Sequence, residues 1–258
     1  MLAEARRVAI AEMVQRDRVL RVADLAQALD VSLMTVRRDI EALHDAGVVE
    51  KIHGGAKARG ERSMYEPGFE LKSTQAEAEK EAIARAAVEL VQEGMAVGLS
   101  AGTTTWTLAK QLATKDRLTI VTNSVRVASV FYDSPSQNTV LLTGGERTPS
   151  DALVGPIATR ALHQLHLDLL FMGVHGVDAE AGFTTPNLLE AEMDRALVAA
   201  SRRVVVVADH SKWGILGVSS IASFEEVEEF ITDDGMPTEA VSLLRERVGS
   251  LRLVTPQR

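Results

Sequence analysis

The alternation of two patterns in the second part of the chain constrains the fold more than any other feature. Short runs rich in Val, Ile and Leu recur there, and segments with helical spacing of apolar residues separate them. The predicted strands are 95–99, 118–121, 140–143, 167–174, 204–208 and 229–232, and the predicted helices include 74–93, 103–112 and one that starts at Val125. Strands that are apolar throughout are buried on both faces, and helices between them connect parallel strands. The pattern therefore predicts an α/β domain with a mostly parallel sheet.

The first sixty residues follow a different pattern, in which helical spacing is ended by glycines. The inward positions of three predicted helices are Val8, Met13 and Val14, then Val22, Leu25, Ala26 and Leu29, then Leu33, Val36, Ile40 and Leu43. Ser32 is the predicted N-cap of the third helix, and residues 48–52 read as one strand of a hairpin that turns at Gly54 and Gly55. Three short helices followed by a hairpin predict a winged helix-turn-helix, whose third helix enters the major groove of DNA.

The outward positions of this predicted third helix and hairpin carry groups that bind DNA. Arginine side chains pair with guanine edges or phosphates, and hydroxyls at a helix start bond to phosphates or base edges. The predicted DNA-binding residues are Ser32, Met34, Thr35, Arg37, Arg38, Lys51, His53 and Gly54. The alternative is an ordinary solvated face, in which Arg37 and Arg38 sit beside Asp39 and Glu41.

A shift in composition separates the two patterns. Between them the chain is rich in Gly, Ser, Pro and charged residues, which is typical of a linker. The predicted division is a winged helix-turn-helix domain at residues 1–58, a linker at 59–73 and a larger α/β domain at 74–258. The net charge is −8, but the first 62 residues hold 11 Lys/Arg against 10 Asp/Glu, which permits a nucleic-acid-binding end.

Several function classes are excluded by composition and by missing motifs. The chain has no cysteine, so disulfides, thiolate nucleophiles and cysteine-ligated metals are absent. It has no run of about 18 uncharged apolar residues and no signal-type apolar core, which predicts a cytoplasmic protein with no membrane partner. Neither GxxxxGK[ST] nor GxGxxG occurs. We expect no cofactor and no metal site.

Polar residues follow several of the predicted strands. Gly102 and three threonines occupy a strand-to-helix turn, where backbone N–H groups and the helix dipole favour an anion. Taken alone, plain capping of the helix by threonine explains this turn better. Asn123, Gly144 and Lys212 follow other strands, and ligands of parallel sheets bind at the carboxyl ends of strands. Lys212 is the natural countercharge for a phosphate, although a single lysine is more often a solvated surface residue.

These segments also carry a family resemblance. Residues 22–56, VADLAQALDVSLMTVRRDIEALHDAGVVEKIHGGA, resemble the N-terminal domain of the DeoR/GlpR family of bacterial transcriptional regulators. AGTTTWTLAKQL, IVTNS, LLTGG, DLLFMGVHGVDAEAGFT and VVVVADHSKWG resemble the family's C-terminal sensor domain and occur in family order. The resemblance implies a ribose-phosphate-isomerase-like topology and a bound sugar phosphate or related metabolite that alters DNA affinity. The effector-binding residues carried over by position are Gly102, Thr103, Thr104, Asn123, Gly144, Gly145 and Lys212.

The chain departs from the family pattern at two positions. Ser100 stands where the family often has Asp, and Asp194 stands where it often has Lys. Loss of an acid and replacement of a cation by an acid change the charge pattern of the pocket if both positions line it. The resemblance therefore leaves the identity of the ligand open.

The predicted function is transcriptional regulation, more as a repressor than as an activator, by binding double-stranded operator DNA. One small head neutralises few phosphates, so tight binding requires a homo-oligomer, a dimer or tetramer, with contacts in the sensor domain. The protein is expected not to be an enzyme. One alternative is a sugar-phosphate isomerase or deaminase with Asp178 or His175 as the base. Another is a metabolite sensor whose head binds a protein.

Overall fold

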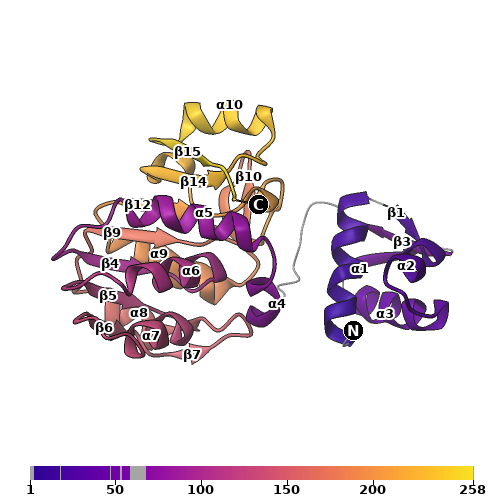
Figure 1. The fold of residues 1–258 in the computed structure, drawn as a ribbon, viewed down its shortest axis with the longest axis horizontal. Coiled ribbons are helices and arrows are strands. Elements are labelled where there is room, and N and C mark those ends of the chain that lie inside the picture. The colour runs from indigo at the N-terminus through magenta and orange to yellow at the C-terminus, as the bar shows by residue number, and fades with distance from the viewer. Residues whose placement is uncertain (1–2, 18, 47, 53, 59–67, 258) are drawn as a thin grey trace. The chain divides into compact units, whose positions relative to one another are not determined.

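The protein folds into two compact units in the computed structural model, Met1–Pro67 and Gly68–Arg258. The structure describes residues 3–17, 19–46, 48–52, 54–58 and 68–257 (Figure 1). Within these ranges, no helix has both the length and the apolar content needed to cross a membrane.

The N-terminal unit consists of three helices and a small antiparallel sheet. Its elements are α1 (Ala3–Asp17), β1 (Val19–Arg21), α2 (Val22–Ala28), α3 (Leu33–Asp45), β2 (Val49–Ile52) and β3 (Gly55–Ala58). The strands lie in the order β1-β3-β2. Ile10, Leu25 and Val36 are fully buried and join the three helices in one core. This arrangement confirms the predicted winged helix-turn-helix.

Two local features of this unit differ from the sequence-based expectation. Leu33 was placed on the inward stripe of the third helix, but it is 50% exposed. It is the first residue of α3, one turn before the helix reaches the core at Val36 and Ile40. The strand β1 was not expected, because three residues are too few to show a period of two. A Cβ atom on Gly55 would lie 2.3 Å from the carbonyl oxygen of Leu20, so glycine permits the pairing of β1 with β3.

The C-terminal unit is built on a seven-stranded parallel sheet. In spatial order its strands are β15 (Leu251–Val254), β14 (Glu229–Asp233), β12 (Val204–Val207), β9 (Leu169–Met172), β4 (Ala96–Leu99), β5 (Thr119–Thr122) and β6 (Thr139–Leu142). Every neighbouring pair is parallel. The predicted mostly parallel sheet is therefore confirmed, and β6 and β15 are its two edges (Figure 1).

Helices cover both faces of this sheet. On one face lie α5 (Glu77–Val88), α6 (Thr103–Leu112) and α7 (Val125–Tyr132), which share a core with alternate residues of the strands. The other face is covered by α8 (Pro156–Leu162), α9 (Leu188–Ala199), α10 (Thr238–Arg247) and a small sheet of β10 (Gly176–Asp178), β11 (Gly182–Thr185) and β13 (Ser219–Ala222). Shorter elements are the hairpin β7 (Glu146–Arg147) and β8 (Leu153–Val154) and the 3-10 helices η1 (His210–Lys212) and η2 (Phe224–Glu226).

The segment expected to be a linker, residues 59–73, contains a helix of the second unit. Residues 59–67 lie outside the described residues, and α4 (Phe69–Ser73) follows them. Phe69 is buried and its ring meets that of Trp106 edge-on, with 5.4 Å between the centroids. Arg126 lies over Phe69 and binds Glu70 at 2.6 Å. These contacts hold α4 on α6 and α7.

The order of the strands creates one topological switch point. From β4 the chain continues to β5 and β6 on one side, and it later adds β9, β12, β14 and β15 on the other side. The loops that follow β4 and β9 therefore leave the sheet in opposite directions. In open parallel sheets, ligands bind in the crevice between two such loops, at the carboxyl ends of the strands.

An aromatic cluster attaches the small sheet to the main one, and it yields a stability prediction. The ring of Phe183 in β11 lies 5.2 Å from that of Phe224 and 5.4 Å from that of Phe230 in β14. Phe183→Ala should lower the free energy of unfolding of the C-terminal unit by about 3–5 kcal/mol, because it leaves a cavity in a packed core. Urea unfolding of the full chain, followed by circular dichroism, measures this; a loss below about 1 kcal/mol would contradict the packing described.

Candidate functional site

The start of α3 is fixed by a hydroxyl pair. The Oγ atom of Ser32 accepts a hydrogen bond from the backbone N–H of Thr35 at 3.1 Å and lies 2.8 Å from the Oγ1 atom of Thr35. Ser32 is therefore the N-cap that the sequence predicts. Its neighbour Met34 is 72% exposed.

The buried carboxylate that follows the two adjacent arginines of α3 pairs with arginines of α1. Asp39 is buried, and it accepts hydrogen bonds from the Nε atoms of Arg6 at 2.5 Å and Arg7 at 3.1 Å. These bonds join α1 to α3. Arg37 and Arg38 are exposed, and among the described residues no carboxylate lies within ion-pair distance of either. Their exposure fits both DNA binding and the alternative of an ordinary solvated face.

The predicted contacts on the wing are arranged differently. The Nζ atom of Lys51 binds the Oε1 atom of Glu41 at 2.7 Å. This hydrogen bond and the charge of Lys51 lower the pKa of Glu41. Gly54, with φ of +77°, occupies the turn between β2 and β3. His53 lies outside the described residues. Lys51 is thus engaged within the protein, whereas Arg37 and Arg38 are not.

At the switch point of the larger sheet, side chains fix the loop after β4. The Oγ atom of Ser100 accepts a hydrogen bond from the backbone N–H of Gly173, at the end of β9, at 3.0 Å. Thr105 donates its hydroxyl to the carbonyls of Ser100 at 2.7 Å and Gly102 at 3.0 Å. Ser100, which stands where the family often has Asp, therefore places a neutral hydrogen-bond acceptor between the two loops of the crevice.

The first turn of α6 presents backbone donors at this crevice. Gly102 is the N-cap residue and supplies no side chain to satisfy the first N–H groups of the helix. Thr103 and Thr104 form the first turn and are buried. A helix start of this kind favours an anion, because its N–H groups and its dipole both attract negative charge.

The other predicted effector-binding residues spread along the same edge. Asn123, after β5, accepts a hydrogen bond from the N–H of Ala101 at 2.8 Å and donates to the carbonyl of Leu153 at 3.2 Å. Gly145 has φ of +116°, and a Cβ atom there would lie 2.4 Å from the carbonyl oxygen of Val154. Gly144, with φ of +72°, precedes it. Asn123 and Gly145 therefore hold neighbouring loops together.

Lys212 and the two glycines lie at opposite ends of this row of loops. Lys212 follows β12, and three strands, β9, β4 and β5, lie between β12 and β6. At about 4.8 Å per strand, the two flanks are roughly 19 Å apart. The start of α6 follows β4, which lies between these two flanks, so a small metabolite bound there would not lie directly beside either of them.

A buried lysine that the sequence analysis missed lies beside Lys212. Lys80 of α5 is 4% exposed, and its Nζ atom donates to the carbonyls of Gln75 at 2.6 Å and of Lys72 in α4. Burial lowers the pKa of Lys80 to about 8; the charges of Lys212 and Lys72 also lower it, and that of Asp209 raises it. These charges therefore lie close together.

Asp209 supplies the negative charge of this cluster, which we call the Lys80 cluster and define as Lys72, Lys80, Asp209 and Lys212. Burial by itself raises the pKa of Asp209, but the charge of Lys212, hydrogen bonds from Ser211 and the charge of Lys80 together hold it below its usual value. Asp209 is thus an anion at neutral pH. Glu77 also raises the pKa of Lys80, so three lysines stand against two carboxylates, and the net charge of these five groups is +1 when Lys80 is protonated.

The sequence does contain a signal for Lys80. It shares one stripe of α5 with Ile83, Ala84 and Ala87, spaced by three, four and seven residues, and all four are buried. A lysine on an otherwise apolar stripe is uncommon, because burial of a charge is costly unless a partner or ligand compensates.

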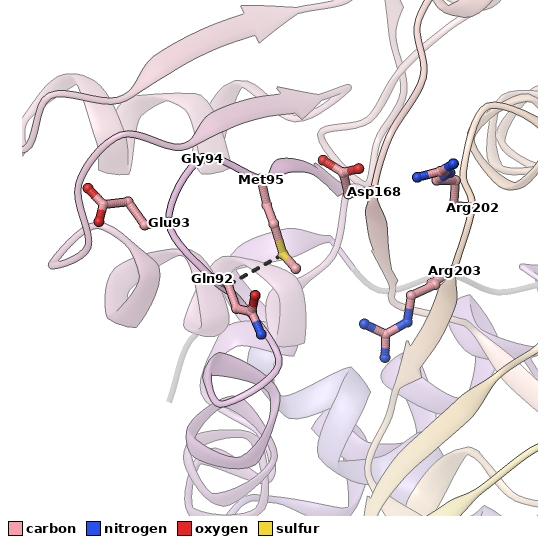
Figure 2. A pocket seen from close by; sticks show the side chains of 7 residues that line it. All are labelled: Gln92, Glu93, Gly94, Met95, Asp168, Arg202 and Arg203. Atoms are coloured by element: carbon pink, nitrogen blue, oxygen red, sulfur yellow. Dashed lines mark hydrogen bonds between the residues drawn. The ribbon is translucent and has the colours of Figure 1, made fainter.

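A separate cavity opens at the opposite edge of the main sheet (Figure 2). Its volume is about 560 Å³, and it is lined by Gln92, Glu93, Gly94, Met95, Asp168, Arg202 and Arg203. These residues precede β4, β9 and β12, at the amino ends of the strands. Asp168 accepts a hydrogen bond from the N–H of Ala96 at 2.9 Å, and Arg203 pairs with Glu228 at 2.7 Å. Glu93 pairs with Arg117, so three of the cavity's charges are already engaged.

Two other positions from the sequence analysis, Asp194 and Asp178, lie away from the crevice, whereas His175 follows the carboxyl end of β9 by three residues. Asp194 is in the second turn of α9, which covers the sheet and is not at a strand end. Asp178 closes the turn between β10 and β11, where its Oδ1 atom accepts from the N–H groups of Glu180 at 3.0 Å and Ala181 at 2.8 Å. Over the described ranges, no three His, Asp or Glu side chains are grouped to hold a metal ion.

Comparison with known proteins identifies both units. Residues 6–61 match the DeoR-like helix-turn-helix domain, and residues 75–234 match the DeoR C-terminal sensor domain. The chain is 38% identical to the HTH-type transcriptional regulator GlpR of Haloferax volcanii over 93% of both chains. It is 32% identical to the HTH-type transcriptional regulator GolR of Listeria innocua, over 87% of this chain and 88% of that one. It is also 32% identical to a putative aga operon transcriptional repressor of Escherichia coli, over 93% and 90%.

A solved structure of ribose 5-phosphate isomerase from Methanocaldococcus jannaschii matches 52% of this chain and 53% of its own, with 18% identity and a TM-score of 0.38. The sequence relatives named above are regulators and not enzymes. Both family models and the relatives agree on a helix-turn-helix head followed by a sensor domain. The chain therefore belongs to the DeoR family of HTH-type transcriptional regulators.

Proposed function

We propose that this regulator is a repressor of a carbohydrate operon and that a phosphorylated sugar or related metabolite, bound at the carboxyl edge of the sensor sheet, controls its DNA affinity. It works in the cytoplasm as a symmetric homo-oligomer. The observation that carries the effector proposal is the Lys80 cluster, in which the buried Lys80 lies with the half-buried Lys72 and Lys212 at the same edge as the start of α6. Repression is supported by the name of the related aga operon repressor.

The exposed face of α3 supplies the DNA-binding part of the proposal. Arg37 and Arg38 project from a helix whose opposite side is fixed by Asp39 and by apolar packing. They are therefore available for guanine edges or phosphates. Ser32 and Thr35 place hydroxyls at the helix start, and Met34 is available for an apolar contact in the groove.

The effector site and the connection to the head share a helix. Lys80 donates hydrogen bonds to carbonyls of Lys72 in α4 and of Gln75 just after α4. This helix is the first described element after residues 59–67. A phosphate that attracts Lys80 competes with these carbonyls and so alters how α4 is held. The ligand then changes DNA affinity only through its different affinity for the two arrangements.

Of the two candidate bases of an isomerase or deaminase, Asp178 and His175, the first is disfavoured by its position. The carboxylate of Asp178 is held in a hairpin turn by two backbone N–H groups. A general base must reach the proton that it abstracts in a bound substrate. No observation favours catalysis over regulation, so we retain a single function.

Arg37→Ala and Arg38→Ala should each weaken operator binding by about 1–3 kcal/mol if the side chain reads guanine, with relaxed specificity at that base pair. Fluorescence anisotropy against a duplex that the wild type selects from a random library measures this. The matched control is Arg245→Ala, which removes an exposed cation from the sensor unit. Wild-type affinity for both head variants would refute the assignment of α3 to the major groove. DNA binding that does not weaken with added salt would indicate that the head binds a protein partner instead.

Lys212→Ala should abolish the thermal stabilisation that a sugar phosphate gives to the wild type, and leave DNA affinity unchanged. A ligand present at 100 times its Kd stabilises the native state by about 2.7 kcal/mol. The screen compares sugar phosphates with their unphosphorylated parents in a thermal-shift assay. Arg202→Ala is the control, because it removes a cation from the cavity at the opposite edge. If Arg202→Ala loses the thermal shift and Lys212→Ala keeps it, the phosphate site would be assigned to that cavity instead.

Lys80 should make effector binding depend on pH. Its pKa is about 8 without ligand, and a bound phosphate raises it. Above pH 8 the free protein therefore takes up a proton on binding, and affinity falls by up to about tenfold per pH unit. Below pH 8 this contribution is constant. Isothermal titration calorimetry in buffers of different ionisation enthalpy measures the proton uptake. Equal uptake at pH 9 by the wild type and Lys80→Met would contradict the assignment.

A further inference from the structure

The edge strand β6 presents an open row of backbone hydrogen-bonding groups. One side of β6 pairs with β5, and no described strand pairs with the other side. The N–H groups of Thr139 and Thr143 donate to carbonyls at Leu118 and Thr122. Alternation along a parallel strand therefore directs the N–H and C=O groups of the residues between, Val140 and Leu142, away from the sheet. Such a row is a template for another strand.

The two edges of the main sheet are protected differently. The strand β15, at the far edge, carries Arg252, which binds Glu229 at 2.7 Å and Glu89 at 3.1 Å. Charged side chains on an edge strand prevent the addition of a further strand. The strand β6 has the sequence Thr-Val-Leu-Leu, with neither charge nor proline. Of these two edge strands, β15 carries a protecting charge and β6 does not.

Neutral side chains flank β6 on both faces of the sheet. Leu141 pairs in register with Val121 and lies on the face covered by α8, whereas Val140 and Leu142 lie on the face covered by α7. Six exposed residues, which we call the β6 surface, are Val125, Ser129 and Tyr132 of α7, Leu141 and Leu142 of β6, and Ile157 of α8. The three α7 residues form one stripe, because they are spaced by four and three. Tyr132 is 89% exposed.

We propose that a second copy of this chain covers the β6 surface, with the two β6 strands antiparallel about a two-fold axis at Leu141. The inference rests on the proposed homo-oligomer and names the surface that forms it. A two-fold axis brings residues near it close to their own copies, so charges there would repel one another. The strand β6, which lies at the axis, contains no charged side chain. Its backbone row is also self-complementary, because it offers both donors and acceptors.

The register of this pairing follows from the hydrogen-bonding pattern. With the axis at Leu141, Val140 exchanges both backbone hydrogen bonds with Leu142 of the second copy, and the symmetric pair does the same. Leu141 then faces its own copy as a non-hydrogen-bonded pair. A four-residue strand alone buries less than the roughly 800 Å² per partner of a stable interface. The stripe of α7 and Ile157 of α8 supply the remaining contact.

A cysteine cross-link tests the register directly, because the natural chain has no cysteine. Cα atoms of a non-hydrogen-bonded antiparallel pair are about 4.5 Å apart, within the roughly 4.4–6.8 Å that a disulfide spans. Oxidised Leu141→Cys should run as a covalent dimer on a non-reducing gel. Leu253→Cys, on the opposite edge strand, is the control and should remain a single chain. Equal cross-linking of the two variants, or none with Leu141→Cys, would overturn the register.

Leu141→Lys tests the surface itself by placing two like charges at the axis. Light scattering after size exclusion at micromolar concentration should show that the mass of the full-length oligomer falls by half. Leu253→Lys should keep the wild-type mass. An unchanged mass for Leu141→Lys, or a monomeric wild type, would overturn the proposal. The thermal shift that the effector gives to Leu141→Lys reports separately on the sensor site. If the variant keeps both this shift and the wild-type mass, the β6 interface is refuted and the proposed effector site is not.

Discussion

Parallel pairing of the seven sensor strands places every loop that follows a strand at one edge of the sheet. Two of these loops, after β4 and β9, leave the sheet in opposite directions and so form the crevice. The hydrogen bond from Gly173 to Ser100 joins their bases, and Thr105 fixes the turn into α6. The backbone donors of α6 are therefore held in place before any ligand binds. A preorganised donor set of this kind reduces the ordering that binding requires.

Buried charges organise both units, and they do so with opposite results. In the head, the buried carboxylate of Asp39 is neutralised by Arg6 and Arg7. Arg37 and Arg38 on the surface of α3 are therefore not needed as its partners. In the sensor, Lys80 is buried near backbone carbonyls, two carboxylates and two other lysines, and burial lowers its pKa to about 8. With Lys80 protonated these charged groups carry a net charge of +1, which favours a ligand that carries negative charge. The first arrangement stabilises a domain, and the second is the one on which the proposed effector site rests.

The local pattern of the sequence predicts the larger elements well. The helix at 103–112 matches α6, and the predicted strands coincide with β4, β5, β6, β9, β12 and β14 to within a few residues. Periodicity is a local property, so it survives without knowledge of the neighbours. The small sheet escaped prediction because Gly182–Thr185 is buried by partners in β10 and β13 and not by an apolar sequence. Leu33 was misplaced because a helix start has not yet turned toward the core.

The sequence by itself determined the two units, the family and the positions of the glycines and threonines at the strand ends, because spacing and motif are written along the chain. Only the tertiary structure decided which of these residues are committed to holding loops, as Asn123 and Gly145 are. It also brought Lys80 to Asp209 and Lys212, which lie more than a hundred positions further along the chain. Their proximity depends on α5 packing beside β12 and β14, and no local period encodes the packing of one element against another distant in sequence.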